Sequence, residues 1–201
     1  MAQGVHVRRW LIAVLVLGLT ALSARETSAA DAPPALTPAT KQDALYYGLT
    51  VFVGEQWHND PIWYTSHYDW QEIQIRPVAG KHRTERWDLW LEGNLTYIKL
   101  EDLPESIELG IGVMNSYDVL PYKGWCLFGE LGAGVGWMSA SPDPHVVGDG
   151  VLGFLDYGIG IKLKTKQGYL FKIGPRFHHR SGLFVRDAGM NSYGLTVSVS
   201  K

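Results

Sequence analysis

Residues 155–164 read LDYGIGIKLK, and their side chains alternate between two kinds at every step. The odd-numbered positions carry Leu, Tyr and Ile, whereas the even-numbered positions carry Asp, Gly and Lys. Because successive side chains of a β-strand point to opposite faces, this alternation predicts a strand with one apolar and one polar face. The polar face is unusual in that small and charged residues share it.

The same alternation occurs in eight segments from Leu45 to the end of the chain, with turn-rich stretches between them. The polar rows combine glycine with charges of both signs, which are Glu72, Asp88, Glu92, Glu108, Glu130 and Asp156 with Arg76, Lys162, Lys172 and Arg176. A barrel of eight tilted strands is narrow inside, and charges buried there must be paired. The sequence therefore predicts a barrel with its polar rows inside and its apolar rows outside.

Aromatic residues gather toward the ends of the apolar rows, as at Trp87, Tyr97, Trp137 and Tyr193. Two aromatic girdles around an apolar band are typical of barrels that span an outer membrane. We therefore expect residues 44–201 to form an all-β, eight-stranded antiparallel transmembrane barrel located in the outer membrane. A barrel of this size has a filled interior, which excludes a porin.

The connections between the predicted strands fall into two sets, one at each end of the barrel. With both chain ends on the inner, periplasmic side, the outer connections are 58–67, 98–104, 139–149 and 182–190, and the inner ones are 78–84, 115–123 and 165–168. Outer loops are the longer set in this class of barrel, and the first outer connection is long and aromatic.

The first 43 residues have a different composition from the rest. Arg8 and Arg9 precede an apolar run, and Ser28-Ala29-Ala30 follows it, an order typical of a secretory signal peptide over residues 1–30. Residues 31–43 are rich in proline and predict a leader without a fold of its own.

The composition also excludes several classes of site. Cys126 is the only cysteine, so neither an internal disulfide nor a CxxC-type zinc or redox site can form. The 18 Lys and Arg residues against 20 Asp and Glu leave no basic face for a phosphate backbone, which argues against nucleic acid as a partner.

Residues 177–182, FHHRSG, hold the most concentrated set of reactive side chains. By strand parity His179 and Ser181 continue the outward row, about 7 Å apart at the backbone, so the imidazole can reach and activate the hydroxyl. Asn191 belongs to the outward row of the next strand, where it can fix the tautomer of the imidazole. The plainer interpretation is hydrogen bonding at the lipid headgroups. His178 and His179 point to opposite faces, so no metal site is expected there.

The chain resembles the outer-membrane lipid A 3-O-deacylase (PagL) family, also called acyloxyacyl hydrolase-like proteins, over about residues 45–200. That family carries His-x-Ser, then Asn-Ala-Gly-Leu, an Asn-Pro-Gly turn and an acidic or replacement residue two positions on. The matching residues here are His179, Ser181, Gly182-Leu183, Gly189 and Asn191.

The resemblance implies a serine carboxylic-ester hydrolase that removes a 3-O-linked acyl chain from the lipid A of lipopolysaccharide without a cofactor. Ser181 would be the nucleophile and His179 the base. Asn191 would orient His179, and backbone N–H groups near Gly182 would hold the oxyanion.

Two positions depart from the family pattern and keep other hypotheses open. The Asn-Ala after the serine is missing, and Asn191 stands where a carboxylate is expected, although Asp187 is a nearby carboxylate that could replace it. An amide can orient an imidazole but cannot neutralise its charge, which predicts impaired activity.

The second hypothesis is therefore a non-catalytic outer-membrane barrel with a structural or adhesive role. A third is a soluble barrel for an apolar ligand, which needs the apolar rows inside. Homodimerisation and the acyl position cut stay open.

Overall fold

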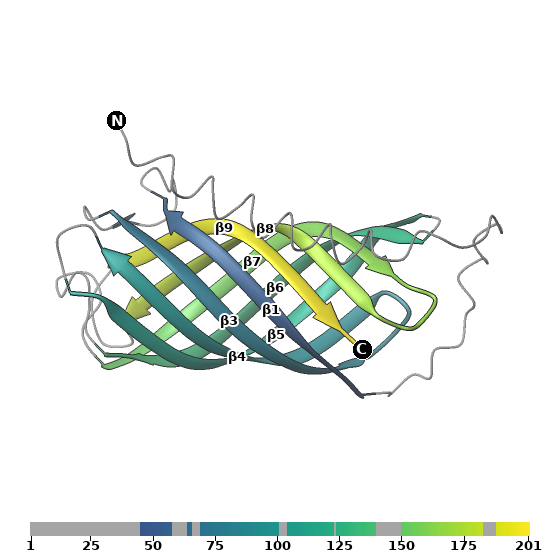
Figure 1. Cartoon of the computed structure of the whole chain (residues 1–201), viewed down its shortest axis with the longest axis horizontal. Helices are drawn as coiled ribbons and strands as arrows, with labels where there is room; N and C mark the ends of the chain where they lie inside the picture. Colours follow the sequence, from purple (N-terminus) through teal and green to yellow (C-terminus); the bar gives the residue numbers. More distant parts are fainter. Residues whose placement is uncertain are drawn as a thin grey trace. The chain divides into compact units, whose positions relative to one another are not determined.

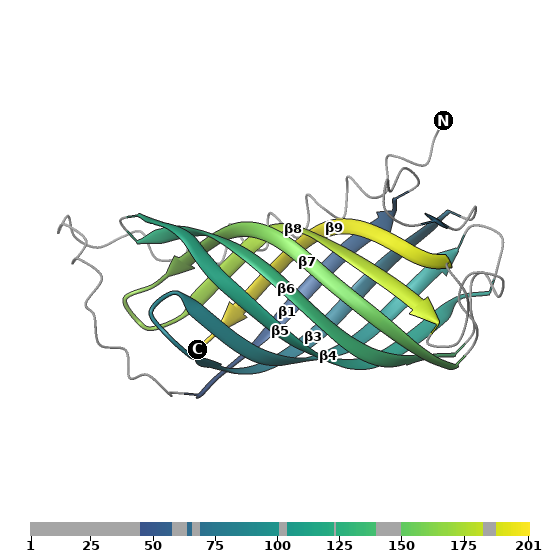
Figure 2. The same cartoon turned by 180° about the vertical axis from the view of Figure 1, so that it is seen from behind.

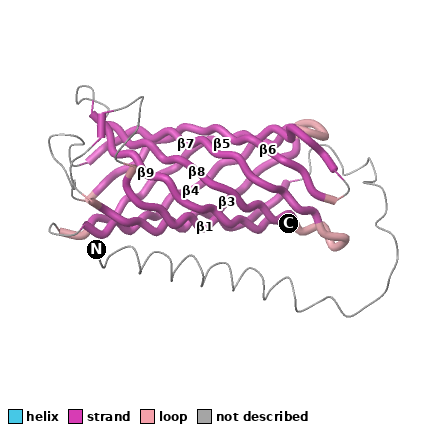
Figure 3. The backbone as a smooth tube through the Cα atoms, turned by 90° about the horizontal axis from the view of Figure 1, so that it is seen from above, coloured by secondary structure: helices cyan, strands magenta, loops and turns pink. Residues whose placement is uncertain are grey.

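The computed structural model describes residues 45–57, 64–65, 69–100, 104–122, 124–139, 150–182 and 188–201. The predicted signal peptide, residues 1–30, and the Pro-rich leader, residues 31–43, lie outside these ranges. All regular structure in the described residues is β-strand (Figure 3). None of these residues belongs to a helix with the length and hydrophobicity that membrane crossing requires.

One sheet contains every strand of the described residues. The strands are β1 (Leu45–Gln56), β2 (Tyr64–Thr65), β3 (Trp70–His82), β4 (Trp87–Leu100), β5 (Ser106–Tyr122), β6 (Trp125–Met138), β7 (Gly150–Lys164), β8 (Leu170–Gly182) and β9 (Ala188–Ser200). Neighbours from β3 to β9 pair antiparallel, and β1 pairs antiparallel with both β3 and β9, which closes the sheet. Figures 1 and 2 show the closed wall of oblique strands from both sides. The predicted eight-stranded antiparallel barrel is confirmed, and the two-residue β2 is an addition to it.

The apolar rows of the barrel face outward, as predicted. Leu109 and Ile159 are 52% and 67% exposed, whereas Glu108 and Asp156 in the same strands are fully buried. Exposed aromatic side chains lie near both ends of the wall, at Tyr47, Trp87, Tyr117 and Tyr122 toward the inner connections and at Tyr97, Trp137 and Tyr193 toward the outer ones. A soluble ligand-binding barrel would bury the apolar rows, so that hypothesis is wrong.

Ion pairs fill the middle of the barrel. The Arg76 guanidinium lies 2.6 Å from the Glu92 carboxylate and 3.0 Å from that of Asp156. The Arg176 guanidinium contacts Glu92 and Glu130, each at 2.7 Å. Buried charges are tolerated only when opposite charges and hydrogen bonds surround them, and here each guanidinium contacts two carboxylates. The ion pairs of the interior rows thus connect different strands of the barrel across its interior.

Apolar side chains close the interior on either side of these ions, which the sequence interpretation of a purely polar interior missed. A buried cluster near the outer connections consists of Trp70, Ile98, Met138, Leu152, Phe154 and Met190. A second cluster in the inner half consists of Tyr46, Val78, Trp90 and Met114. Buried hydrophobic clusters therefore lie toward both ends of the barrel, in addition to the charged middle.

Two of the three inner connections are shorter than predicted. Residues 78–84 and 115–123 were expected to be turns, but β3 continues to His82 and β5 to Tyr122. Each strand of a closed barrel has a hydrogen-bonding partner on both sides, which keeps these segments extended despite their turn-forming residues. In β5 the strand absorbs the irregularity as a register shift between Asp118 and Leu120. The last outer connection is also shorter than 182–190, because β8 ends at Gly182 and β9 begins at Ala188.

Candidate active site

The outer ends of β8 and β9 bring two of the predicted site residues into contact. His179 and Asn191 are directly opposite each other across the two strands, and His179 Nδ1 lies 2.5 Å from Asn191 Oδ1. Because an amide oxygen can only accept a hydrogen bond, Nδ1 must carry the proton. In the neutral ring Nε2 then holds the lone pair, which is the protonation state that a general base requires.

Gly189 explains how the imidazole is directed toward Ser181. Gly189 and Ser181 are opposite each other in the β8–β9 register. A Cβ atom at position 189 would lie only 2.2 Å from His179 Cε1 and 2.9 Å from Nδ1, so the ring occupies the space above this glycine. The imidazole therefore extends from its own position toward the level of Ser181, which lies two residues further along the same outward row.

An aromatic wall, formed by Trp57, Phe177 and Tyr157, lies beside this pair on the side of the inner connections. The Trp57 and Phe177 rings are 5.0 Å apart, and Phe177 stacks on Tyr157 at 4.9 Å. Trp57 is anchored at the site, since its backbone N–H donates to the carbonyl oxygen of Asn191. His179 and Asn191 are only 8% and 3% exposed although they belong to outward rows.

The backbone of β9 is held on both sides at this point. Beyond its last pair with β1, at Ser192 and Gln56, β9 pairs in parallel with β2 through Ala188 and Gly189. A segment of the first outer connection thus lies against the strand end that carries Gly189. This contact between distant parts of the chain fixes the backbone on which the imidazole rests.

The interior supports the same strand end from behind. Arg180, between His179 and Ser181 in sequence, points inward and is fully buried. Its guanidinium is hydrogen bonded to the carboxylates of Glu72 and Glu108. Because a bidentate or doubly paired guanidinium has a fixed orientation, β8 is pinned at the residue that separates the two candidate side chains.

The remaining predicted residues are placed as follows. Gly182 is the last residue of β8 and pairs with Leu152 of β7. Leu183 and Asp187 lie outside the described residues. His178 faces the interior, where its Nδ1 is 2.8 Å from Asp156. In the described part of the chain, no group of three or more His, Cys, Asp or Glu side chains is arranged to hold a metal ion.

Sequence reasoning missed two contributors to this site. One is Trp57, whose contact with β9 depends on a strand pairing that no local sequence pattern reveals. Gly153 of β7 lies opposite Ser181 on the other side. The sequence does mark Gly153 as unusual, because this glycine interrupts the outward row of Val151, Leu155 and Tyr157.

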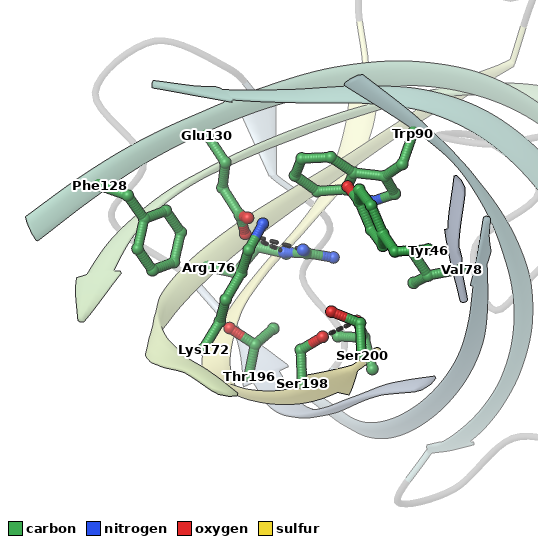
Figure 4. A pocket seen from close by; sticks show the side chains of 11 residues that line it. Tyr46, Val78, Trp90, Phe128, Glu130, Lys172, Arg176, Thr196, Ser198 and Ser200 are labelled. Carbon is green, nitrogen blue, oxygen red and sulfur yellow. Dashed lines mark hydrogen bonds and ion pairs between the residues drawn. The ribbon is translucent and has the colours of Figure 1, made fainter. Parts of the chain in front are cut away.

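A separate pocket lies inside the barrel, in its inner half (Figure 4). Its walls include the rings of Tyr46, Trp90 and Phe128, and Lys172 projects among them. The Lys172 ammonium is 3.9 Å from the centroid of the Trp90 ring and 3.4 Å from the Ser116 hydroxyl. A cation over an aromatic face is stabilised by the ring quadrupole, so this arrangement accounts for the half-buried amine without a ligand.

Comparisons with known proteins identify the architecture. No family model and no curated protein matches the chain. Among solved structures, Neisserial surface protein A (NspA) matches at 14% identity with a TM-score of 0.56, over 78% of this chain and 95% of that one. The outer membrane enzyme PagL matches at 17% identity with a TM-score of 0.54, over 75% of this chain and 97% of that one.

Structural similarity at such low sequence identity concerns the fold alone, and both structures have the same fold. The closed antiparallel wall has the architecture of eight-stranded outer-membrane barrels. Its exterior of exposed Leu, Ile, Val and aromatic side chains is suited to lipid and not to water. The protein is therefore an outer-membrane β-barrel with a polar pair of side chains where β8 ends and β9 begins.

Proposed function

We propose that this barrel is a serine-dependent ester hydrolase that removes an ester-linked acyl chain, the 3-O chain, from the lipid A of lipopolysaccharide. In this proposal Ser181 is the nucleophile and His179 the general base. Asn191 positions His179, and backbone N–H groups near Gly182 stabilise the oxyanion. No cofactor takes part.

The observation that carries the proposal is the orientation of His179. Its Nδ1 proton is held by Asn191, and its ring lies over Gly189 at the level of Ser181. A nucleophilic hydroxyl next to a base that a third group orients is the arrangement used for acyl transfer on many unrelated folds. Polar groups on a lipid-facing row are costly, which favours a function over a purely structural explanation.

The reaction follows from these positions. Ser181 Oγ attacks the carbonyl carbon of the ester while His179 Nε2 takes the hydroxyl proton, and the resulting oxyanion is stabilised by backbone donors. The bond from the carbonyl carbon to the sugar oxygen then breaks, and His179 returns the proton to that oxygen. A water molecule, deprotonated by His179, cleaves the acyl-Ser181 ester and releases the fatty acid.

The membrane setting supports a lipid substrate. Ser181 belongs to an outward row, next to the apolar surface that faces acyl chains, so an ester of a membrane lipid reaches it without leaving the bilayer. PagL, a solved structure with the same fold, is an outer membrane enzyme. Together with the His179 and Ser181 motif, this makes lipid A the substrate we propose.

Mass spectrometry of lipid A tests the proposal. Cells that overproduce the protein should accumulate lipid A lacking one hydroxyacyl chain, and cells that overproduce Ser181→Ala should not. Ser198→Ala, which removes a hydroxyl from the inner half of the barrel, is the matched control and should behave as the wild type.

Labelling provides a second, independent test. A fluorophosphonate should modify the purified wild type at Ser181 and leave Ser181→Ala unmodified. If the lipid A of all strains is unchanged and no label is incorporated, the chain is a non-catalytic barrel of structural or adhesive role.

A further inference from the structure

Ser181 is flanked on both neighbouring strands by glycine. Gly189 of β9 and Gly153 of β7 are its partners in the two registers. The space above Gly189 is occupied by the imidazole of His179. Gly153 lies on the other side of Ser181, away from the base.

The surroundings of Gly153 are apolar. Along β7 it lies between Val151 and Leu155 on the outward row, and Val135 of β6 is its partner on the far side. Val151 and Val135 are 54% and 52% exposed, so they belong to the lipid-facing surface. An apolar strip thus begins at Ser181 and crosses Gly153 toward β6.

Two other directions from Ser181 along the barrel wall are less suited to an alkyl chain. On the β9 side the His179 ring covers Gly189, and β2 pairs with the strand beyond it. Toward the inner connections on β8, His179 and then Phe177 follow on the same row, and Phe177 is part of the aromatic wall.

We propose that Gly153 is a specificity-determining residue: the acyl chain of the ester leaves Ser181 across Gly153 and lies against Val151, Leu155 and Val135. This inference rests on the proposed function, because it concerns the substrate of the same site. The absence of a side chain at position 153 brings the alkyl chain close to the wall, so that its carbonyl group meets Ser181 Oγ. Ester substrates with long alkyl chains are favoured over short ones for this reason.

The test compares two glycines of the lipid-facing surface. Gly153→Leu places a branched side chain on the proposed path. Gly129→Leu makes the same change on β6, where the atom nearest to an added Cβ is the Gly158 carbonyl oxygen at 4.0 Å. Folding of each variant is checked by the shift in gel mobility between unheated and boiled samples.

Hydrolysis of a long-chain and a short-chain p-nitrophenyl ester is then measured in detergent, together with labelling by a compact fluorophosphonate. We expect Gly153→Leu to lower kcat/KM for the long chain by roughly 10- to 100-fold, the range for a pocket altered by a few methylene groups. Its short-chain activity and labelling should stay at the wild-type level, and Gly129→Leu should match the wild type in all three measurements. Gly153→Ala, a milder change in case the leucine variant does not fold, should lie between the two.

Each contrary result has a distinct meaning. Wild-type long-chain activity in folded Gly153→Leu, or an equal loss of long-chain, short-chain and labelling activity, would overturn the role of Gly153 and leave the hydrolase proposal standing. A wild type that neither cleaves any ester nor takes up the label would overturn the hydrolase proposal itself, and this inference with it.

Discussion

Replacing Asn191 with aspartate should make the proposed enzyme faster. Asn191 Oδ1 accepts the Nδ1 proton of His179 at 2.5 Å, so the amide already fixes the orientation of the ring. The amide carries no charge, however, and the imidazolium formed during the attack has no carboxylate beside it. Asn191→Asp adds that charge without changing the size of the side chain.

The size of the effect follows from the geometry. Two unit charges about 4 Å apart attract by about 4 kcal/mol at an effective dielectric constant of about 20. Because Asn191 is only 3% exposed, burying the new carboxylate offsets part of this attraction. A net gain of about 1.5 to 3 kcal/mol in the transition state corresponds to a rate increase of about 10- to 150-fold. Asn191 Nδ2, a buried donor without a partner among the described residues, is removed by the same change.

The assay is kcat/KM for ester hydrolysis by the purified, folded protein. Asn191→Asp should raise it, and Asn191→Ala should lower it by removing the group that orients the ring. Asn115→Asp makes the same chemical change on the outward row of β5 and should leave the rate unchanged. If folded Asn191→Asp is no faster than the wild type, the reasoning that assigns Asn191 an electrostatically incomplete orienting role is refuted.

Three further predictions concern the packing around the site and the barrel wall. Gly189→Ala should lower kcat/KM by about 10- to 100-fold, because the added methyl group would displace the imidazole of His179. Gly129→Ala is the control and should keep the wild-type rate, because the atom nearest to its added Cβ is 4.0 Å away. Equal rates for the two variants would contradict the placement of the His179 ring. Arg180→Met should destabilise the barrel by about 3 to 5 kcal/mol, since it leaves two buried carboxylates unpaired, and a urea midpoint unchanged from the wild type would show that the pairs contribute little. Ile159→Arg should cost about 2 to 4 kcal/mol in bilayer refolding experiments, and a cost near zero would mean that this row does not face lipid.

The period of the side chains predicted most of the fold. Alternation such as that of residues 155–164 identified strands, and the charges on the polar face showed that this face is inside. Strand ends were less predictable. Pro121 belongs to β5 and not to a turn, because closure of the barrel supplies a partner strand that extends the segment beyond its local preference.

The candidate site was predictable in its members but not in its geometry. Parity placed His179, Ser181 and Asn191 on outward rows, because parity depends only on the strand itself. The geometry depends instead on the register between β8 and β9. This register sets His179 opposite Asn191 and places the His179 ring over Gly189. Trp57 reaches the site from the opposite end of the chain, so its role follows only from closure of the barrel by β1 and β9.

The interior ion pairs constrain how the polypeptide enters the membrane. Arg76 and Asp156 are separated by 80 residues, and Arg180 and Glu72 by 108, so no single hairpin contains both partners. A hairpin inserted alone would carry uncompensated charges into hydrocarbon, which is strongly unfavourable. Neutralisation of these charges is complete only when β3 has met β7 and β8 across the interior. Insertion and ring closure must therefore advance together, and the growing sheet has to keep its charged face in a polar environment until the seam between β1 and β9 is made.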